Sequence, residues 1–311
     1  MIEAAFLSRT ERFPSVPSTN DVVRGWLDAG TAEVCLAVAD EQTAGRGRAG
    51  RRWHAPSGAG LLCSLGFRPS WLAPERTWRL AAIVALAMAD AAEEVAGLAD
   101  RAVRLKWPND LVIETTPGEV RKLAGVLGET IGLGSDDPRT IVGIGLNADW
   151  AAADFPAELA TTMTSLREAS GGRPIDVAML LDAFVTRLEV RTLALQAGHF
   201  DVADWIERQL TNGRPVRLDA PDGSSRVVRA LGVDVTSGGL RVADLIDGAD
   251  GAHDGHGAVA TADDGHGADD AHDGQGSAGS SGGTAAPVES EQIILSGEIQ
   301  HLRLVDIRAG L

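Results

Sequence analysis

The stretch from Asp247 to Ser290 is the feature that most limits how this chain can fold. Its 44 residues include eleven glycines, nine carboxylates and four histidines, and none of them is basic. Such a stretch cannot bury enough apolar surface to offset the entropy lost on ordering, and compact domains rarely hold a structureless loop longer than about 15 residues. We therefore predict a disordered insertion at about 247–290. Its His and Asp side chains would bind a divalent metal only weakly, because a flexible segment lacks preset geometry.

The other 267 residues are only mildly acidic. The whole chain has 28 Lys and Arg against 44 Asp and Glu, a net charge of −16, and the insertion supplies nine of those negative charges. The whole chain is 44% hydrophobic, and the remainder is long enough for one or two domains with a core. A protein of this charge is not expected to bind nucleic acid polymers.

The cysteines and the apolar runs point to a cytoplasmic protein with no membrane partner. Cys35 and Cys63 each lie in an apolar run, which is typical of buried thiols in a reducing compartment rather than of a disulfide or a metal site. The N-terminal residues lack the pattern of a signal peptide. No apolar run reaches the roughly 20 residues that a membrane-spanning helix needs.

Hydrophobic patterning predicts an α+β domain over residues 1–211. A short helix is expected after Ser18-Thr19-Asn20, which would cap it, a long one from Pro74 to about residue 95, and two more between 176 and 210. Strands are expected at 34–39, 61–67, 103–106, 111–114, 123–131 and 140–147. Because helices and strands do not alternate strictly, we predict a mixed β-sheet with helices packed on one side.

A second, smaller domain is predicted for residues 212–311. After Asn212-Gly213 the pattern changes to short strands at 215–218, 227–233, 240–245, 293–295 and 299–304, with turn signals between them. This spacing is typical of a small β-barrel that is interrupted by the acidic insertion.

A loop rich in glycine and arginine follows the strand that is expected at 34–39. Gly45-Arg-Gly47-Arg-Ala-Gly50 matches the dinucleotide-binding pattern G-x-G-x-x-G, but that motif needs a helix at its end, and the Pro- and Gly-rich residues that follow do not favour one. The Gly-Arg loop (residues 45–52) is therefore either a solvated loop or one that brings guanidinium and backbone N–H groups around a polyanion.

Lysine is rare enough in this chain for its positions to carry information. Of the 28 basic residues 26 are arginine, and the two lysines, Lys106 and Lys122, fall 16 residues apart. Lysine places a compact charge close to an oxyanion where a planar guanidinium does not fit. Pro108 forces an extended or turned backbone in the KWPND segment (residues 106–110), which projects Asn109 and Asp110. Chance placement of the two lysines is the alternative.

Five motifs together resemble a known family. They are Ser18-Thr19-Asn20, Gln42 with Gly45-Arg-Gly-Arg-Ala-Gly-Arg51, Lys106-Trp-Pro-Asn-Asp110, Lys122-Leu-Ala-Gly125 and Gly143-Ile-Gly-Leu-Asn147. In this order, over about residues 15–150, they resemble the biotin protein ligases, also called holocarboxylase synthetases. The resemblance implies a class II synthetase-like ligase domain followed by an SH3-like C-terminal domain. No helix-turn-helix is expected before Ser18, so the repressor activity of bifunctional family members is not implied.

The resemblance also implies a reaction and its participants. Family members use ATP and Mg²⁺ to convert biotin to biotinyl-5′-AMP, and they transfer biotin to one lysine of the biotin carboxyl carrier domain of acetyl-CoA carboxylase or a related enzyme. A lipoate or octanoate ligase of the same fold and a non-catalytic biotin-binding regulator are the alternatives. The oligomeric state stays open.

Residue roles follow from the motif positions. The resemblance assigns catalysis to Lys122, Arg48 and Asp110, of which Asp110 would orient or deprotonate the acceptor amine. It assigns biotin binding to Ser18, Thr19, Asn20, Gln42, Arg46, Gly47, Arg48 and Lys122. Lys106, Asn109 and Asn147 are assigned to nucleotide binding or support, Asn109 also to Mg²⁺-linked contacts. Trp53 would either cover a flat ring or simply pack, so it is not included among the site residues, and no metal ligand is assigned.

Overall fold

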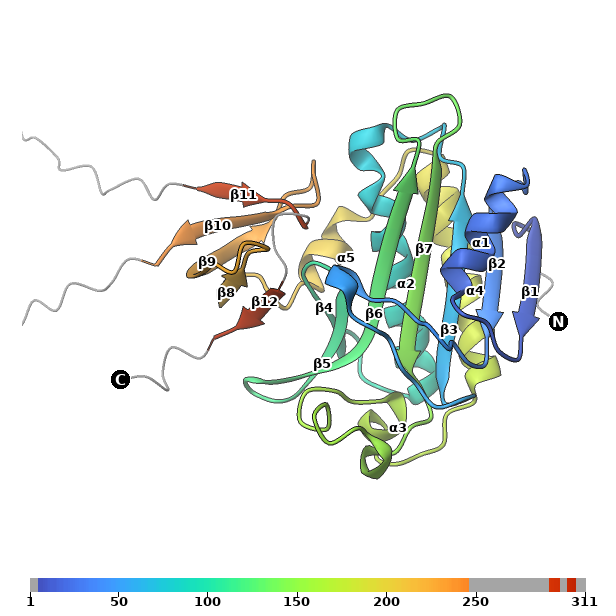
Figure 1. Ribbon diagram of the computed structural model, residues 1–311. Coiled ribbons are helices and arrows are strands. Elements are labelled where there is room, and N and C mark those ends of the chain that lie inside the picture. Colours follow the sequence, from blue (N-terminus) through green and yellow to red (C-terminus); the bar gives the residue numbers. More distant parts are fainter. Residues whose placement is uncertain (1–4, 246–290, 297–300, 306–311) are drawn as a thin grey trace, which may run out of the picture.

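A computed structural model of the chain describes residues 5–245, 291–296 and 301–305 (Figure 1). The predicted insertion at 247–290 lies outside the described residues. The strands of the larger sheet are β1 (Arg9–Phe13), β2 (Cys35–Ala39), β3 (Gly60–Phe67), β4 (Val103–Lys106), β5 (Asp110–Thr116), β6 (Glu119–Ile131) and β7 (Arg139–Asn147). The helices are α1 (Thr19–Asp28), α2 (Trp78–Ala96), α3 (Leu166–Ala169), α4 (Val177–Gln196) and α5 (Val202–Glu207).

The larger sheet is mixed, as the sequence predicts. Its strand order is β1-β2-β3-β7-β6-β5-β4, in which β1 runs parallel to β2 and every other neighbouring pair is antiparallel. The six predicted strands are all present. Strand β1 was not predicted, because Arg9–Phe13 is a mostly exposed, polar edge strand without apolar alternation.

Helices cover both faces of this sheet, so the predicted packing on one side is wrong. In β2, Leu36 and Val38 face the core built with α2 and α4, whereas Cys35 and Ala37 pack in a separate cluster with Trp26 of α1 (Figure 1). All five residues of β2 are buried. A strand that is apolar on both faces needs cover on both, which α1 supplies on the second face.

Both cysteines are free and buried, as expected from their apolar surroundings. Burial raises the pKa of the Cys63 thiol to about 12 and that of Cys35 to about 11. The thiols are therefore protonated at neutral pH and act as small apolar groups in the sheet.

A charged cluster ties α5 to α2 behind the sheet. The Arg208 side chain is only 3% exposed and donates to Glu93 at 2.8 Å, to Asp90 at 2.6 Å and to Asp204 at 3.1 Å. The guanidinium also donates to the carbonyl of Val103 at 3.0 Å. A buried cation with this many acceptors fixes the positions of three elements around the start of β4.

The smaller sheet holds five antiparallel strands in the order β11-β10-β9-β8-β12. They are β8 (Pro215–Asp219), β9 (Ser225–Val233), β10 (Leu240–Asp244), β11 (Gln292–Ile294) and β12 (His301–Leu304), close to the predicted positions. Among the described residues the edge strands β11 and β12 do not pair with each other, so the sheet is open and the predicted closed barrel is not confirmed.

The smaller sheet supports the KWPND segment of the larger one. Trp107 Nε1 donates to the carbonyl of Gly238 at 2.9 Å, and Trp78 Nε1 of α2 donates to the carbonyl of Thr236 at 3.2 Å. Arg214, just before β8, pairs with Glu114 of β5 at 2.9 Å. No helix in the described ranges is long and apolar enough to cross a membrane.

Candidate functional site

The Gly-Arg loop forms a narrow hairpin rather than the start of a helix. Gly47 N donates to Arg51 O at 2.7 Å, and Trp53 N donates to Gly45 O at 2.9 Å. A Cβ on Gly45 would lie 2.6 Å from the Trp53 carbonyl oxygen, so only glycine fits there. Ala49 and Gly50 turn the chain at φ 54° and 72° within a single 3₁₀ turn, η1 (Arg48–Gly50). The sequence-based rejection of a dinucleotide motif is thereby confirmed.

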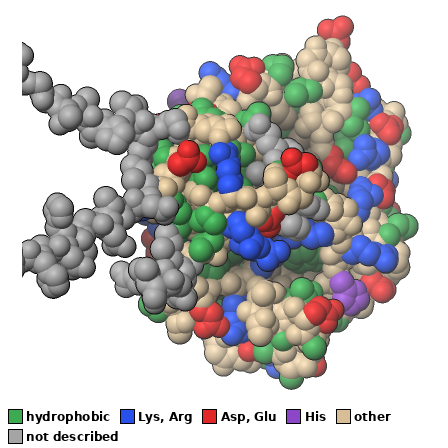
Figure 2. All heavy atoms as spheres, turned by 60° about the vertical axis from the view of Figure 1, so that its left-hand side comes forward, with side chains coloured by type: hydrophobic (Ala, Val, Ile, Leu, Met, Phe, Trp, Pro, Cys, Tyr) green, Lys and Arg blue, Asp and Glu red, His purple; other side chains and the backbone are tan. Residues whose placement is uncertain are grey.

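A cleft of about 740 Å³ lies beneath this hairpin, on the α1 side of the sheet. All the residues that the motifs single out line this main cleft: Ser18, Thr19, Asn20, Gln42, Arg46, Gly47, Arg48, Lys106, Asn109, Asp110, Lys122 and Asn147. Figure 2 shows Lys and Arg side chains gathered beside a hollow on this face of the molecule. Segments far apart in the chain therefore build one cationic site.

Trp53 also lines the main cleft, although the sequence analysis did not include it among the site residues. It lies against two glycines: a Cβ would be 2.5 Å from its ring at Gly145 and 3.3 Å at Gly125. Lys122 Nζ lies 5.6 Å from the centre of the indole ring, within range of a cation–π contact. The sequence feature that could have predicted this packing is the pair Gly143 and Gly145, two residues apart on one face of β7, because glycine lets a bulky group pack directly on the sheet.

A hydrogen-bonded chain crosses the wall of the main cleft. Glu129 on β6 accepts from Asn20 Nδ2 at 2.8 Å, and Asn20 Oδ1 accepts from Ser64 Oγ at 2.6 Å. Ser64 Oγ lies 2.6 Å from Thr19 Oγ1, and the Thr19 N–H donates to Gln42 Oε1 at 2.8 Å. Ser64 and Glu129 were not predicted, because each is an unremarkable polar residue within a strand.

Both lysines of the chain meet at one carboxylate. Lys122 Nζ lies 2.6 Å and Lys106 Nζ 3.6 Å from the carboxylate of Asp110. Burial alone would raise the pKa of the Asp110 carboxyl, but the two cations outweigh burial and hold it below its usual value. Burial lowers the pKa of the Lys106 ammonium, an effect that Asp110 only partly offsets.

The two predicted arginines of the loop have different partners. Arg46 pairs with Asp21 at 2.8 Å and with Glu129 at 3.4 Å, so it fastens the loop to α1 and β6. Arg48 donates to the carbonyl of Ser296, and burial together with Arg51 lowers the pKa of its guanidinium. Arg48 lies close enough to feel the charge of Asp110, as does Arg51 of the same loop.

The remaining predicted residues shape the cleft through the backbone. Asn109 Nδ2 donates to Val126 O at 2.9 Å, which fastens the turn before β5 to β6. Asn147 Nδ2 donates to Thr164 O at 2.9 Å, while its Oδ1 is buried and has no hydrogen-bond partner in the described part of the chain. Ser18 is the N-cap residue of α1, as predicted, but its side chain makes no capping hydrogen bond.

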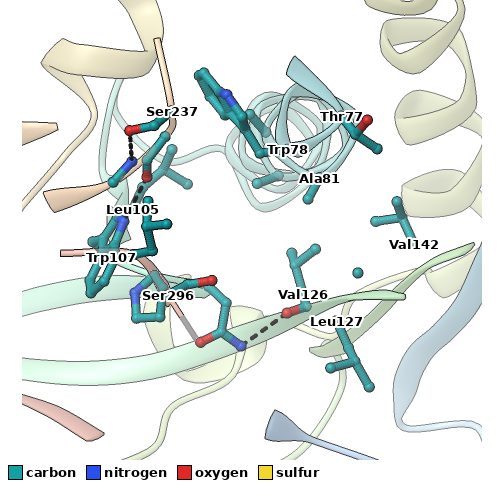
Figure 3. A pocket seen from close by; sticks show the side chains of 18 of the residues that line it. Thr77, Trp78, Ala81, Leu105, Trp107, Val126, Leu127, Val142, Ser237 and Ser296 are labelled. Atoms are coloured by element: carbon teal, nitrogen blue, oxygen red, sulfur yellow. Dashed lines mark hydrogen bonds between the residues drawn. The ribbon is translucent and has the colours of Figure 1, made fainter. Parts of the chain in front are cut away.

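A second cavity of about 470 Å³ lies between α2, the KWPND segment and the smaller sheet. Trp78 and Ala81 of α2 face Val126 and Val142 across it, with Trp107 on the near side (Figure 3). Its wall shares six residues with the main cleft: Arg48, Lys106, Asn109, Asp110, Val126 and Leu127. Asp110 therefore stands between an apolar cavity and a cationic one.

The site suits a reaction between two anions. Several fixed cations converge on the main cleft, and Asp110 is the single carboxylate among the described residues that line it. Within the described ranges no group of three or more His, Cys, Asp or Glu side chains could hold a metal ion.

Comparison with known proteins gives consistent matches. The model of the Biotin/lipoate A/B protein ligase family matches residues 12–147. The bifunctional ligase/repressor BirA of Bacillus spizizenii is 35% identical over 176 residues, 57% of this chain and 51% of that protein. The biotin–[acetyl-CoA-carboxylase] ligase of Mycobacterium tuberculosis is 32% identical over 201 residues, 64% of this chain and 70% of that protein. The chain thus spans about half the length of the BirA relatives from Bacillus that it matches.

Solved structures share the fold. The biotin protein ligase of Aquifex aeolicus, in complex with biotin and ATP, has a TM-score of 0.67 at 23% identity, covering 96% of this chain and 100% of that one. A mutant of the same ligase in complex with biotin has a TM-score of 0.61 at 26% identity, covering 75% and 91%.

Proposed function

Because the chain belongs to the biotin/lipoate A/B protein ligase family, we propose that it is an ATP-dependent biotin protein ligase. It forms biotinyl-5′-AMP from biotin and ATP, and then transfers biotin to a lysine of a biotin carboxyl carrier domain. The observation that carries this proposal is the meeting of Lys122, Lys106 and Arg48 around Asp110 in a cleft with a polar chain at its other wall. Relatives named as biotin–[acetyl-CoA-carboxylase] ligases support the choice of biotin and of the carrier.

In the first step, a biotin carboxylate oxygen attacks the α-phosphorus of ATP, and the bond to pyrophosphate breaks. Two anions approach each other, so fixed positive charge must compensate for their repulsion in the transition state. We assign this role to Lys122, whose ammonium lies between Asp110 and Trp53. Lys106, Asn109 and Asn147 support the nucleotide side. Mg²⁺ accompanies ATP as part of the substrate, held by its phosphates.

In the second step, the neutral acceptor amine attacks the carbonyl carbon of the adenylate, AMP leaves, and the nitrogen releases one proton to water. Asp110 borders both the main cleft and the second cavity, so it can accept a hydrogen bond from an amine that approaches the adenylate. Because two lysines hold the pKa of Asp110 low, we assign it the orienting role rather than proton abstraction.

We also propose that the chain divides functionally at residues 211 and 212, with catalysis in the first part. The five antiparallel strands of the second part support its assignment as an SH3-like domain. Its contacts with Trp107 and with Arg48, through Gly238 and Ser296, support a role in holding the KWPND segment and the Gly-Arg loop.

The decisive experiment mixes the protein with MgATP, biotin and a purified biotin carrier domain, and follows the mass of the carrier. We expect an increase of one biotinyl group that requires ATP and the acceptor lysine. Equimolar lipoate in the same tube tests the alternative ligase of this fold. Transfer of lipoate in preference to biotin, or binding of biotin without any transfer, would overturn the proposal.

Replacing Arg48 by alanine is expected to release the adenylate prematurely. The guanidinium belongs to a loop that closes over the cleft, and loss of one charge-assisted hydrogen bond of about 1.5–3 kcal/mol corresponds to roughly 10- to 150-fold faster dissociation. The measurement is stopped-flow release of preformed biotinyl-AMP, with labelling of lysines on a bystander protein as a second readout. Release at the wild-type rate would contradict the assignment of Arg48.

Replacing Gly145 by alanine is expected to weaken biotin binding. The new Cβ would lie 2.5 Å from the Trp53 ring, and relieving such overpacking costs about 1–3 kcal/mol, or roughly 5- to 150-fold in affinity. Gly128→Ala is the matched control, because the nearest atom to its new Cβ is Ala81 Cβ at 3.9 Å. Calorimetric titration of both variants with biotin checks the difference, and equal affinities would remove Trp53 from the site.

A further inference from the structure

Three donors converge on one oxygen of Glu129. Its Oε2 accepts from Asn20 Nδ2 at 2.8 Å and lies 3.2 Å from the Arg24 guanidinium and 3.4 Å from that of Arg46. The side chain is 26% exposed and comes from β6, whereas two of its partners come from α1 and the third from the Gly-Arg loop. An ionised carboxylate only accepts hydrogen bonds, so the groups that face Glu129 must all donate.

This requirement fixes the orientation of the Asn20 amide. Because Asn20 gives its NH₂ group to Glu129, its Oδ1 is turned to Ser64 and can only accept. Ser64 is completely buried, at 0% exposure, and its Oγ lies 2.6 Å from that oxygen. The single hydroxyl proton of Ser64 is therefore used in the bond to Asn20.

The order of donors and acceptors continues to Thr19. Its Oγ1 lies 2.6 Å from Ser64 Oγ, and since the proton of Ser64 is already committed, Thr19 must be the donor of that bond. Thr19 Oγ1 then has no proton left for its longer contact with Gln42 Oε1, at 3.1 Å. That oxygen instead accepts from the Thr19 N–H at 2.8 Å. Thr19 is left with a free lone pair at the cleft wall, so it accepts from a ligand.

We infer that Glu129 is a positioning and specificity-determining residue: by fixing the donor-to-acceptor order of the chain, it makes Thr19 an acceptor for a ligand N–H. A ureido ring offers such an N–H, whereas a ring with a carbonyl or a methylated nitrogen at this point does not. The inference rests on the proposed function, since it concerns how the main cleft recognises the biotin head group. Without Glu129 the amide of Asn20 can turn over, and Thr19 can then donate as readily as accept.

The experiment compares biotin with the two biotins that are methylated at one ureido nitrogen. Calorimetry on the full chain gives the dissociation constants, and the preference is their ratio. We expect one methyl isomer to bind the wild-type protein at least 100-fold more weakly than biotin. Glu129→Leu and Ser64→Ala, which cut the chain at different points, should each reduce that preference at least tenfold. Glu129→Gln keeps an acceptor oxygen and should retain more of the preference than Glu129→Leu.

Asp21→Asn is the matched control. Asp21 is the other carboxylate that pairs with Arg46, but among the described residues its carboxylate makes no hydrogen bond to the side chain of Asn20 or Ser64, so the control should keep the full preference. The KM for biotin should rise in Glu129→Leu while kcat at saturating biotin stays within about threefold, because Glu129 does not contact the reacting atoms. Equal weakening of biotin and of its methyl isomers would show a merely structural role and overturn the inference, as would an unchanged preference in both variants. Failure of the wild-type protein to bind biotin would instead overturn the proposed function.

Discussion

Replacing Lys122 by alanine is expected to slow adenylate formation by about 100- to 1,000-fold, the range found when one preorganised donor to a developing anion is removed. The ammonium lies 2.6 Å from Asp110 and faces the Trp53 ring, so the substitution removes charge from the point where carboxylate and α-phosphate meet. Biotin-dependent exchange of labelled pyrophosphate into ATP measures this step without the acceptor protein.

The neighbouring residue provides a control for Lys122. Arg121 is also on β6, but its guanidinium pairs with Glu119 and does not line the main cleft. Arg121→Ala should exchange pyrophosphate at nearly the wild-type rate, and both variants should melt close to the wild-type temperature. Wild-type exchange in Lys122→Ala would refute the role that we assign to this lysine.

Replacing Arg208 by methionine is expected to lower the free energy of unfolding by about 3–5 kcal/mol, because it leaves the carboxylates of a buried cluster without their cation. Glu93 is itself buried and accepts from both Arg208 and the Val103 N–H. For a protein of this size the corresponding fall in melting temperature is roughly 6–20 °C.

Urea-induced unfolding followed by circular dichroism tests the stability of this variant. Arg12→Met removes an exposed ion pair with Asp40 and should cost less than about 1 kcal/mol. Because the Arg208 cluster lies on the far side of the sheet from the main cleft, pyrophosphate exchange at low temperature should change little. A loss of stability no larger than that of Arg12→Met would show that the cluster is dispensable.

Much of the fold was predictable because its signals are local. The apolar runs of β2, β3 and β7 all fall within a residue or two of the expected positions. The long helix α2 begins at Trp78, four residues after the predicted start, and only a short 3₁₀ helix, η2 (Pro74–Arg76), begins at Pro74. The predictions that were wrong or missing concern features set by tertiary packing. Strand β1 forms because β2 offers it a pairing partner. Helix α1 covers the second face of the sheet because β2 is apolar on both faces.

The same division applies to the site. Motif residues such as Arg48, Asp110 and Lys122 were predictable, and they do line one cleft. Glu129 and Ser64 were not predictable, because their roles depend on hydrogen bonds with Asn20. Asn20 is separated from them by 109 and 44 residues of sequence, respectively. Trp53 was predictable only in part. The glycines that leave room for its ring are visible in the sequence, but the position of the ring over them is not.

The pairing of both lysines with Asp110 makes the chain selective toward amine-directed reagents. A succinimidyl ester finds no ε-amino group elsewhere, since Lys106 and Lys122 are the only two in 311 residues. Acylation of lysine therefore reports on the main cleft alone, and a ligand that covers Lys122 shields half of the reactive side chains. Mass spectrometry of peptides, which separates these lysines from the N-terminal α-amino group, can thus read cleft occupancy without a radioactive substrate or an engineered label.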